Sequence, residues 1–214
     1  MVLSRPQLRL ERLRAEIADA LRRLAAAGLV LGAAGNVSAK ERELIAISPT
    51  KLPYETLRPE DVSVVSAVGE LLEGPEPSIE LPGHLLLLAR PDVGAVVHTH
   101  SPYASALACV LDEIPVVAPE QAASVGGPIS VAPYAPSGEA ATGEAVLAAA
   151  AGRWAAIVRN HGPFCLGRDL EDALACAFAV EESARLYALA RVHGEPSVLP
   201  DEEVERVARL AGRR

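Results

Sequence analysis

The stretch Ala95-Val-Val-His-Thr-His100 joins a short apolar run to two histidines. On an extended chain, side chains two residues apart point to the same face, so His98 and His100 can converge on one point where a buried strand ends. A third histidine, His161, also follows an apolar run and precedes a glycine. Three neutral imidazoles are a familiar ligand set for a catalytic zinc ion that keeps an open coordination position. These histidines are therefore candidate metal ligands, and the alternative is three separate surface or core histidines.

Helical and extended patterns surround this stretch in an irregular order. A capping box at Ser4-Arg-Pro-Gln7 opens a predicted helix that ends at Gly28. Periodicity predicts further helices over residues 78–90, 101–111, 137–151 and 169–193, and strands at 44–48, 62–68, 70–72, 94–98, 114–117, 129–132 and 154–159. Residues 32–38 form a loop or a strand. Because strands and helices do not alternate regularly, we expect a three-layer or α+β arrangement with a largely antiparallel sheet.

Composition limits the class of protein. The 214 residues are 50% hydrophobic and 22% charged, which predicts a globular core, in a single domain with a C-terminal tail from about residue 195. The net charge of −8 argues against a nucleic-acid or membrane-binding surface spread over the protein. We see no signal peptide, and the uncharged segment 93–111 carries too many polar residues for a membrane span. Three cysteines without a paired spacing indicate a reduced, cytoplasmic protein.

A carboxylate precedes the central histidines in Ser78-Ile-Glu-Leu-Pro-Gly-His84. Glu80 falls in the first turn of a predicted helix, where the helix dipole favours its negative charge. It is either a capping acid or a general acid/base near the metal. His84 lies one turn later on the same face, as a fourth ligand or, in the interpretation we favour, as a packed and hydrogen-bonded histidine.

Small and hydroxyl residues gather at three predicted turns. These are Gly35-Asn-Val-Ser38, Ser48-Pro-Thr-Lys51 and Ser78. Such residues can present N–H and O–H groups to a phosphate, and Lys51 can add a point charge. None of the segments is a P-loop or a dinucleotide fingerprint, and ordinary turn chemistry is the alternative interpretation.

Taken together, the order of these motifs resembles the class II aldolase/adducin family, and within it the L-fuculose-phosphate aldolases. The resemblance covers about residues 8 to 193. It is carried by Gly35-Asn-Val-Ser38, Ile47-Ser-Pro-Thr50, Pro77-Ser-Ile-Glu80, Ala95-Val-Val-His-Thr-His100 and Arg159-Asn-His-Gly162, followed by a long closing helix. It implies a three-layer α/β/α sandwich around a mostly antiparallel sheet, and a homotetramer with active sites at subunit interfaces.

The resemblance also implies a site and a reaction. His98, His100 and His161 would hold Zn²⁺ or another divalent transition metal, and Glu80 would be the catalytic acid/base. The substrate phosphate would bind at Gly35, Asn36, Thr50 and Ser78. The expected reaction is cleavage of a short ketose 1-phosphate to a dihydroxyacetone-phosphate-type ketone and an aldehyde, through a metal-stabilised enediolate.

Several positions depart from the fuculose enzymes. The segment after Ile114-Pro115 lacks the tyrosine that handles the aldehyde oxygen, and no tyrosine follows Tyr187. Lys51 stands where the phosphate loop usually has glycine, and Ile79 replaces a second serine. These departures indicate different aldehyde handling or a different substrate.

Other functions remain open from the sequence. Relatives with the same metal chemistry include sugar-phosphate 4-epimerases, dehydratases and decarboxylases. A non-catalytic scaffold like the adducin head is an alternative from another class, which the retained histidines and Glu80 argue against. A metal hydrolase unrelated to aldolases would need a zinc-bound water as its nucleophile.

Overall fold

The computed structural model describes residues 8–213, so the predicted capping box at Ser4–Gln7 lies outside the described residues. Its helices are α1 (Glu11–Ala26), α2 (Leu81–Leu88), α3 (Pro102–Ala108), α4 (Pro119–Val125), α5 (Ala140–Ala150), α6 (Leu170–His193) and α7 (Asp201–Leu210). Its strands are β1 (Asn36–Glu41), β2 (Leu44–Ile47), β3 (Ser63–Ser66), β4 (Leu71–Glu73), β5 (Ala95–His98), β6 (Glu113–Ile114), β7 (Ile129–Ala132), β8 (Ala155–Val158) and β9 (Gly162–Gly167).

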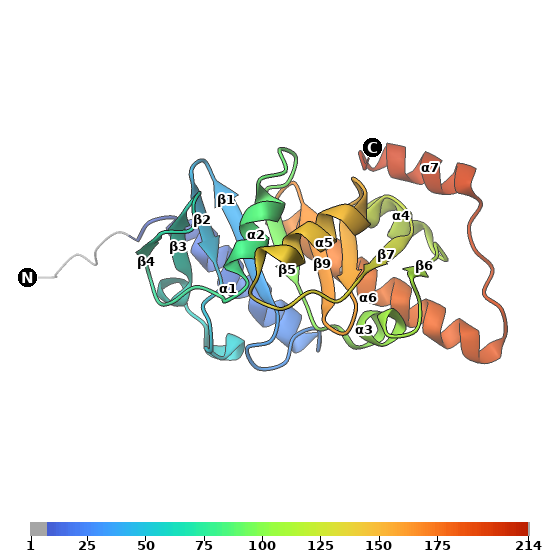
Figure 1. Ribbon diagram of the computed structural model, residues 1–214, viewed down its shortest axis with the longest axis horizontal. Coiled ribbons are helices and arrows are strands. Elements are labelled where there is room, and N and C mark those ends of the chain that lie inside the picture. The colour runs from blue at the N-terminus through green and yellow to red at the C-terminus, as the bar shows by residue number, and fades with distance from the viewer. Residues whose placement is uncertain (1–7, 214) are drawn as a thin grey trace, which may run out of the picture.

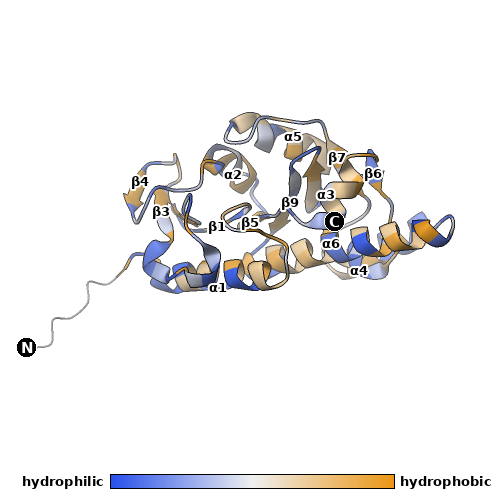
Figure 2. Cartoon of the chain, turned by 90° about the horizontal axis from the view of Figure 1, so that it is seen from below, coloured by the Kyte–Doolittle hydropathy of each residue, from blue (hydrophilic) through white to orange (hydrophobic). Residues whose placement is uncertain are grey.

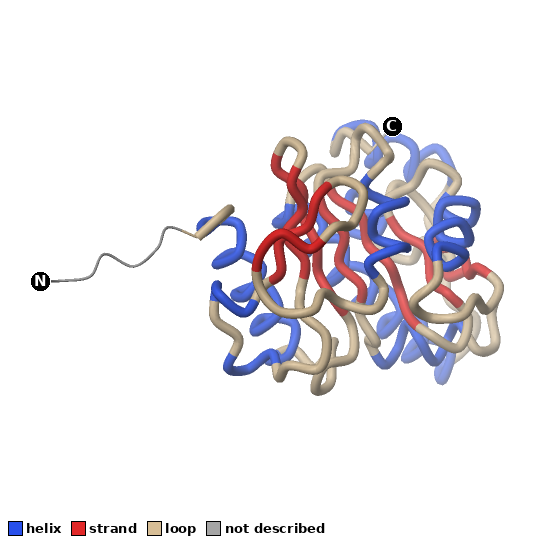
Figure 3. The backbone as a smooth tube through the Cα atoms, turned by 60° about the vertical axis from the view of Figure 1, so that its left-hand side comes forward, coloured by secondary structure: helices blue, strands red, loops and turns tan. Residues whose placement is uncertain are grey.

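The strands form one sheet in the order β4-β3-β2-β1-β5-β9-β8-β7-β6 (Figure 1). Every neighbouring pair is antiparallel except β7 and β8. Figure 3 shows the strands running side by side between the helices. The mostly antiparallel sheet predicted from the sequence is confirmed.

Helices cover both faces of this sheet. Helix α1 packs on β1 and β2 and helix α6 on β5 and β9, whereas α2 and α5 pack on each other and on the opposite face. Figure 2 shows α1 and α6 below the strands and α2 and α5 above them. The three-layer α/β/α arrangement is therefore confirmed. Aliphatic side chains such as Ile17, Leu21 and Ile157, all fully buried, fill the space between the layers.

Some element boundaries were predicted wrongly. The strand expected at 114–117 ends at Ile114, because Pro115 has no N–H to donate to a sheet. The helix expected from residue 78 begins at Leu81, and the Ser78 hydroxyl instead accepts from the Glu80 N–H. Strand β9 and helix α4 were not predicted as elements at all.

Close backbone approach fixes the middle of the sheet. Asn36 of β1 and Phe164 of β9 lie on either side of His98 of β5. A Cβ atom on Gly35 would meet the His98 carbonyl oxygen at 2.8 Å, and one on Gly162 would meet the Thr99 carbonyl oxygen at 2.2 Å. Only glycine fits at these two positions, so the ends of β1, β5 and β9 come together where the motifs lie.

The segment expected as a tail is docked on the domain. Leu199 donates its N–H to the carbonyl of Val116, and α7 packs Val204 against Ala122 of α4. The side chain of Arg213 pairs with Asp172 of α6 and lies over the ring of Trp154. Within residues 8–213, no helix combines the length and the apolar composition that crossing a membrane requires.

Candidate active site

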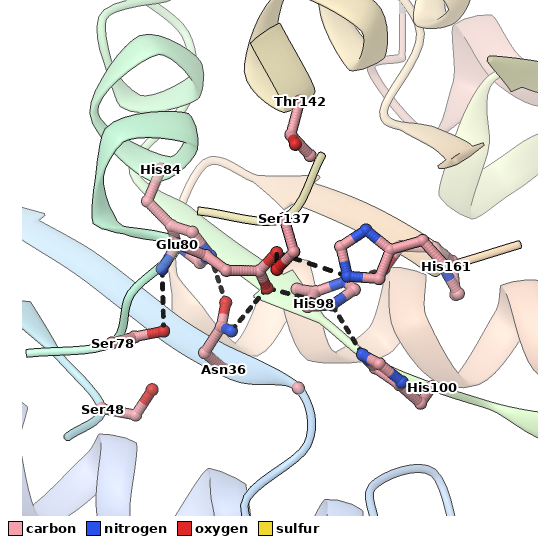
Figure 4. A network of polar contacts seen from close by, with 12 residues as sticks. Asn36, Ser48, Ser78, Glu80, His84, His98, His100, Ser137, Thr142 and His161 are labelled. Carbon is pink, nitrogen blue, oxygen red and sulfur yellow. Dashed lines mark hydrogen bonds and ion pairs between the residues drawn. The ribbon is translucent and has the colours of Figure 1, made fainter. Parts of the chain in front are cut away.

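Three histidines meet at the carboxyl end of β5. His98 is the last residue of the strand, His100 lies just before α3, and His161 lies in the turn between β8 and β9. One ligand atom from each lies within 4.8 Å of the others, and the Nε2 atoms of His98 and His100 are 3.1 Å apart (Figure 4). The convergence predicted from the sequence spacing is present.

Contacts around the histidines fix their orientation. Nδ1 of His98 lies 3.0 Å from the carbonyl oxygen of Pro163, and because a carbonyl only accepts, this nitrogen carries the proton. The Nε2 lone pair of His98 therefore points toward His100, while the ring stacks on Phe164 at a centroid distance of 4.0 Å. From α6, the carboxylate of Glu181 accepts from the N–H groups of Tyr103 and Ala104, which fixes the start of α3 just after His100.

The residues present fit a divalent transition metal. Ligand nitrogens at zinc-binding distance and a tetrahedral angle lie roughly 3.3 Å apart. The His98–His100 separation is 3.1 Å, and the Glu80 carboxylate oxygens lie 3.2 Å from Nε2 of His98 and 3.3 Å from Nε2 of His161. Burial lowers the pKa of His98 to about 3 and also lowers the pKa of His100, so both rings are neutral and able to ligate at pH 7.

Glu80 faces the three histidines from the residue before α2. Its side chain is buried, with Oε2 accepting from Nδ2 of Asn36 at 2.8 Å and Oε1 accepting from the hydroxyl of Ser137 at 2.8 Å. Burial alone would raise the pKa of Glu80, but the neighbouring imidazoles and these two hydrogen bonds lower the pKa to about 2. Glu80 is therefore a buried, ionised carboxylate held by neutral donors.

Behind Glu80, His84 is a fully buried partner of Asn36 and not a metal ligand. Its Nε2 lies 2.5 Å from Oδ1 of Asn36, and its Nδ1 lies 2.6 Å from the hydroxyl of Ser38. Because Nδ2 of Asn36 donates to Glu80, its Oδ1 is the acceptor and Nε2 of His84 is the donor. Burial lowers the pKa of His84 to about 4, so the ring stays neutral. The packed and hydrogen-bonded alternative favoured from the sequence is the one observed.

A cleft of about 270 Å³ opens beside Glu80. All four residues predicted to bind a phosphate line it, together with Lys51, Ile79 and Ser137; the four are Gly35, Asn36, Thr50 and Ser78. The Asn36 amide is already paired with Glu80 and His84, so its side chain holds the carboxylate rather than pointing freely into the cleft. The three segments predicted to bind a phosphate thus border one cleft together with Glu80.

Two polar residues of the site were missed. Ser137 donates to Glu80 from a loop 57 positions along the chain, and no local pattern indicates a contact across that separation. The hydroxyl of Tyr54 donates to the carbonyl of Gly35 at 2.5 Å and so holds the wall of the cleft. Burial raises the pKa of Tyr54 to about 12, which keeps it a donor.

Comparison with known proteins identifies the family of this chain. The family model described as the class II aldolase and adducin N-terminal domain matches residues 15–188. The chain belongs to the class II aldolase and adducin family. The family resemblance drawn from the motifs is thereby confirmed.

Relatives within the class II aldolase and adducin family cover most of the chain. It is 39% identical over 91% of its length to a 5-methylthioribulose-1-phosphate/5-deoxyribulose-1-phosphate aldolase of Rhodospirillum rubrum, covering 89% of that protein. It is 36% identical to a 5-deoxy-D-ribulose 1-phosphate aldolase of Bacillus thuringiensis serovar kurstaki, over 94% of this chain and 95% of that one. A solved structure of an L-fuculose 1-phosphate aldolase superposes with a TM-score of 0.88 at 32% identity, covering 93% of this chain and 95% of the other.

Proposed function

We propose that this protein is a metal-dependent carbon–carbon lyase that cleaves a short ketose 1-phosphate to a dihydroxyacetone-phosphate-type ketone and an aldehyde. The observation that carries the proposal is the ionised carboxylate of Glu80, which lies within 3.3 Å of two of the three converging histidines and borders the cleft. An ionised acid beside a metal-binding set is what reversible proton transfer at a carbon next to a carbonyl requires.

His98, His100 and His161 would hold the metal, with zinc as the proposed ion. When bound, such an ion supplies a Lewis acid that stabilises negative charge on the carbonyl and neighbouring hydroxyl oxygens of the substrate. The lowered pKa values of His98 and His100 keep their lone pairs available, and the carbonyl of Pro163 keeps the proton on Nδ1 of His98.

Glu80 would move the proton. Breaking the bond between C3 and C4 turns the C4 hydroxyl into the aldehyde carbonyl with release of its proton, and leaves an electron pair on C3 of the ketone fragment. That carbon must then be protonated, so the reaction as a whole neither gains nor loses a proton. In the synthetic direction the Glu80 carboxylate takes that proton away. Asn36 and Ser137 each donate to one of its oxygens, which keeps the group ionised and fixes its direction until a proton arrives.

The substrate phosphate would bind at Gly35, Asn36, Thr50 and Ser78, which line the cleft next to Glu80. Binding a phosphate remote from the reacting bond supplies energy that positions the reacting carbons. Two similar relatives are named as aldolases of 5-deoxyribulose 1-phosphate. The absence of the expected tyrosine after Pro115 also favours a substrate other than fuculose 1-phosphate. We therefore propose 5-deoxypentulose 1-phosphates as the substrate class.

We also propose a cytoplasmic homotetramer with active sites at subunit interfaces. The far end of α6 supports association, because Leu186, Leu189 and Val192 are exposed there. The three cysteines are free, as a reducing compartment requires.

The test combines metal content with product analysis. Purified protein should hold about one divalent metal per chain, and a His98→Ala, His100→Ala variant should lose it. The metal-loaded protein should release an aldehyde from 5-deoxyribulose 1-phosphate faster than from fuculose 1-phosphate. Metal-loaded protein that cleaves neither ketose would overturn the proposal.

Product analysis also separates the alternative reaction. A further relative, 36% identical over 85% of this chain, is named L-ribulose-5-phosphate 4-epimerase UlaF and comes from Salmonella paratyphi B. An epimerase interconverts two ketose phosphates and releases no free aldehyde. Conversion of ribulose 5-phosphate without aldehyde release would replace the aldolase proposal with that reaction.

A further inference from the structure

We propose that Lys51 is a specificity-determining residue of this site, whose ammonium group binds the phosphate of the substrate and rejects unphosphorylated ketoses. The inference rests on the proposed function for the identity of the substrate. Lys51 lines the cleft whichever phosphorylated substrate binds there.

The cleft beside Glu80 has one cationic side chain among the residues that line it, and that side chain is Lys51. The other polar groups there are neutral hydroxyls and amides, such as Thr50 and Ser78, or the Glu80 carboxylate. A phosphate is repelled by the carboxylate and attracted by the ammonium, so the two charges give a bound substrate a direction. The phosphate would lie toward Lys51 and the reacting carbons toward Glu80.

The two lysines of the chain differ in what they contact. Lys40 donates from Nζ to the carbonyl of Leu88 at 2.7 Å. Lys51 is exposed, and within residues 8–213 its ammonium takes part in no hydrogen bond or ion pair. A cation that borders a cleft without a protein partner is available to a ligand, and an ammonium binds phosphate as a point charge.

The backbone at Lys51 supports a functional reason for this side chain. Its φ angle is +61°, in the left-handed region that side chains with a Cβ rarely adopt. Glycine would take this conformation without strain, and glycine is what the resemblance predicts in this loop. A strained conformation retained for a charged residue at a cleft points to a role in binding.

Kinetics of three variants test the inference. Lys51→Met removes the charge at similar length, Lys51→Gly removes both charge and strain, and Lys40→Met is the matched control. We expect both Lys51 variants to raise KM for the ketose 1-phosphate about ten-fold, with kcat within about two-fold, because a charged hydrogen bond is lost in ground and transition states alike. Lys40→Met should leave KM unchanged. Lys51→Gly should unfold at the same temperature as the wild type or higher, which excludes a structural cause for its weaker binding.

A labelling experiment tests the site without turnover. Reductive methylation should modify Lys51 readily and Lys40 slowly. Inorganic phosphate should protect Lys51 when compared with chloride at equal ionic strength, and peptide mass spectrometry reads out both positions. Equal labelling of Lys51 in phosphate and chloride, or an unchanged KM in both Lys51 variants, would overturn the inference. If wild-type enzyme cleaves no ketose phosphate and Lys51 is still protected, the phosphate site stands and the proposed reaction falls.

Discussion

Two carboxylates, the buried Glu80 before α2 and the half-buried Asp172 on α6, show how differently one chemical group is held in this fold. Asp172 on α6 accepts from the guanidinium groups of Arg168 and Arg213. Glu80 is held by an amide and a hydroxyl and faces the imidazoles of His98 and His161, and within residues 8–213 it forms no ion pair with Arg or Lys.

The pKa values of Glu80 and Asp172 are both lowered despite the desolvation of each carboxyl. The two charges nevertheless differ in whether they remain available to a proton or a ligand. The charge of Asp172 is already matched by fixed cations, so it can only stabilise the fold. The charge of Glu80 has no Arg or Lys partner within residues 8–213, so it stays available to a proton or a metal ion. The identity of the partners therefore separates the proposed acid/base, Glu80, from a carboxylate whose charge stabilises the fold.

The largest effect on activity is expected for Glu80→Gln. An amide of the same shape keeps the packing but cannot carry a proton, so kcat for aldehyde release should fall by about a thousand-fold or more. Glu182→Gln, which changes an exposed carboxylate paired with Arg185, is the matched control and should leave kcat unchanged. A Glu80→Gln enzyme that keeps a tenth of the wild-type kcat would show that Glu80 is a structural acid like Asp172.

A smaller effect is expected behind Glu80, at His84. In His84→Phe, the ring volume is kept but Asn36 loses the donor that orients its amide toward Glu80. We expect kcat to fall about ten-fold with the metal content unchanged, and the free energy of unfolding to fall by about 1–3 kcal/mol because buried polar groups lose partners.

The conservative variant separates orientation from simple destabilisation. In His84→Gln, the side-chain amide can again donate to Oδ1 of Asn36, so kcat should recover part of the loss. Both rates are corrected for the folded fraction, measured by urea denaturation. Equal kcat values for His84→Phe and wild type after that correction would contradict a positioning role.

Contacts between residues that are close in the sequence could be predicted, whereas contacts between distant segments could not. The spacing of His98 and His100 on a strand is a local rule, and the structure places them together as expected. The cap at Asp169 and the end of α6 at Gly194 are local signals too, and both are observed. Most of the sheet followed from short apolar runs, and the antiparallel order from their irregular succession.

What failed depended on contacts between distant segments. Ser137 contacts Glu80 because α5 packs against α2. The ion pair between Arg213 and Asp172 joins residues 41 positions apart. Strand β9 was missed because Gly162 and Pro163 are turn residues by local propensity, whereas close approach to β5 extends the chain there. The sequence also offered no reason to expect that the tail after residue 195 returns to cover α4.

The mildest prediction concerns that returning segment and its dependence on pH. Asp172→Asn leaves the buried Arg213 without its carboxylate partner. The free energy of unfolding at pH 7 should therefore fall by about 1–3 kcal/mol, which is below the range for a fully buried pair because the C-terminus can relax.

Burial alone would raise the pKa of Asp172, but Arg168 and Arg213 lower it. A carboxyl with a lowered pKa in the folded state contributes its full stabilisation above the unfolded pKa of about 3.9 and loses it as pH falls toward the folded value. The stability difference between wild type and Asp172→Asn should therefore be constant from pH 7 to about pH 5 and shrink below pH 4.

Asp201→Asn, at the exposed start of α7, is the control. Its free energy of unfolding should depend on pH below pH 4 in the same way as that of the wild type. A difference between wild type and Asp172→Asn that stays constant down to pH 3 would contradict the prediction, because it would mean that the ionised state of Asp172 does not stabilise the contact with Arg213.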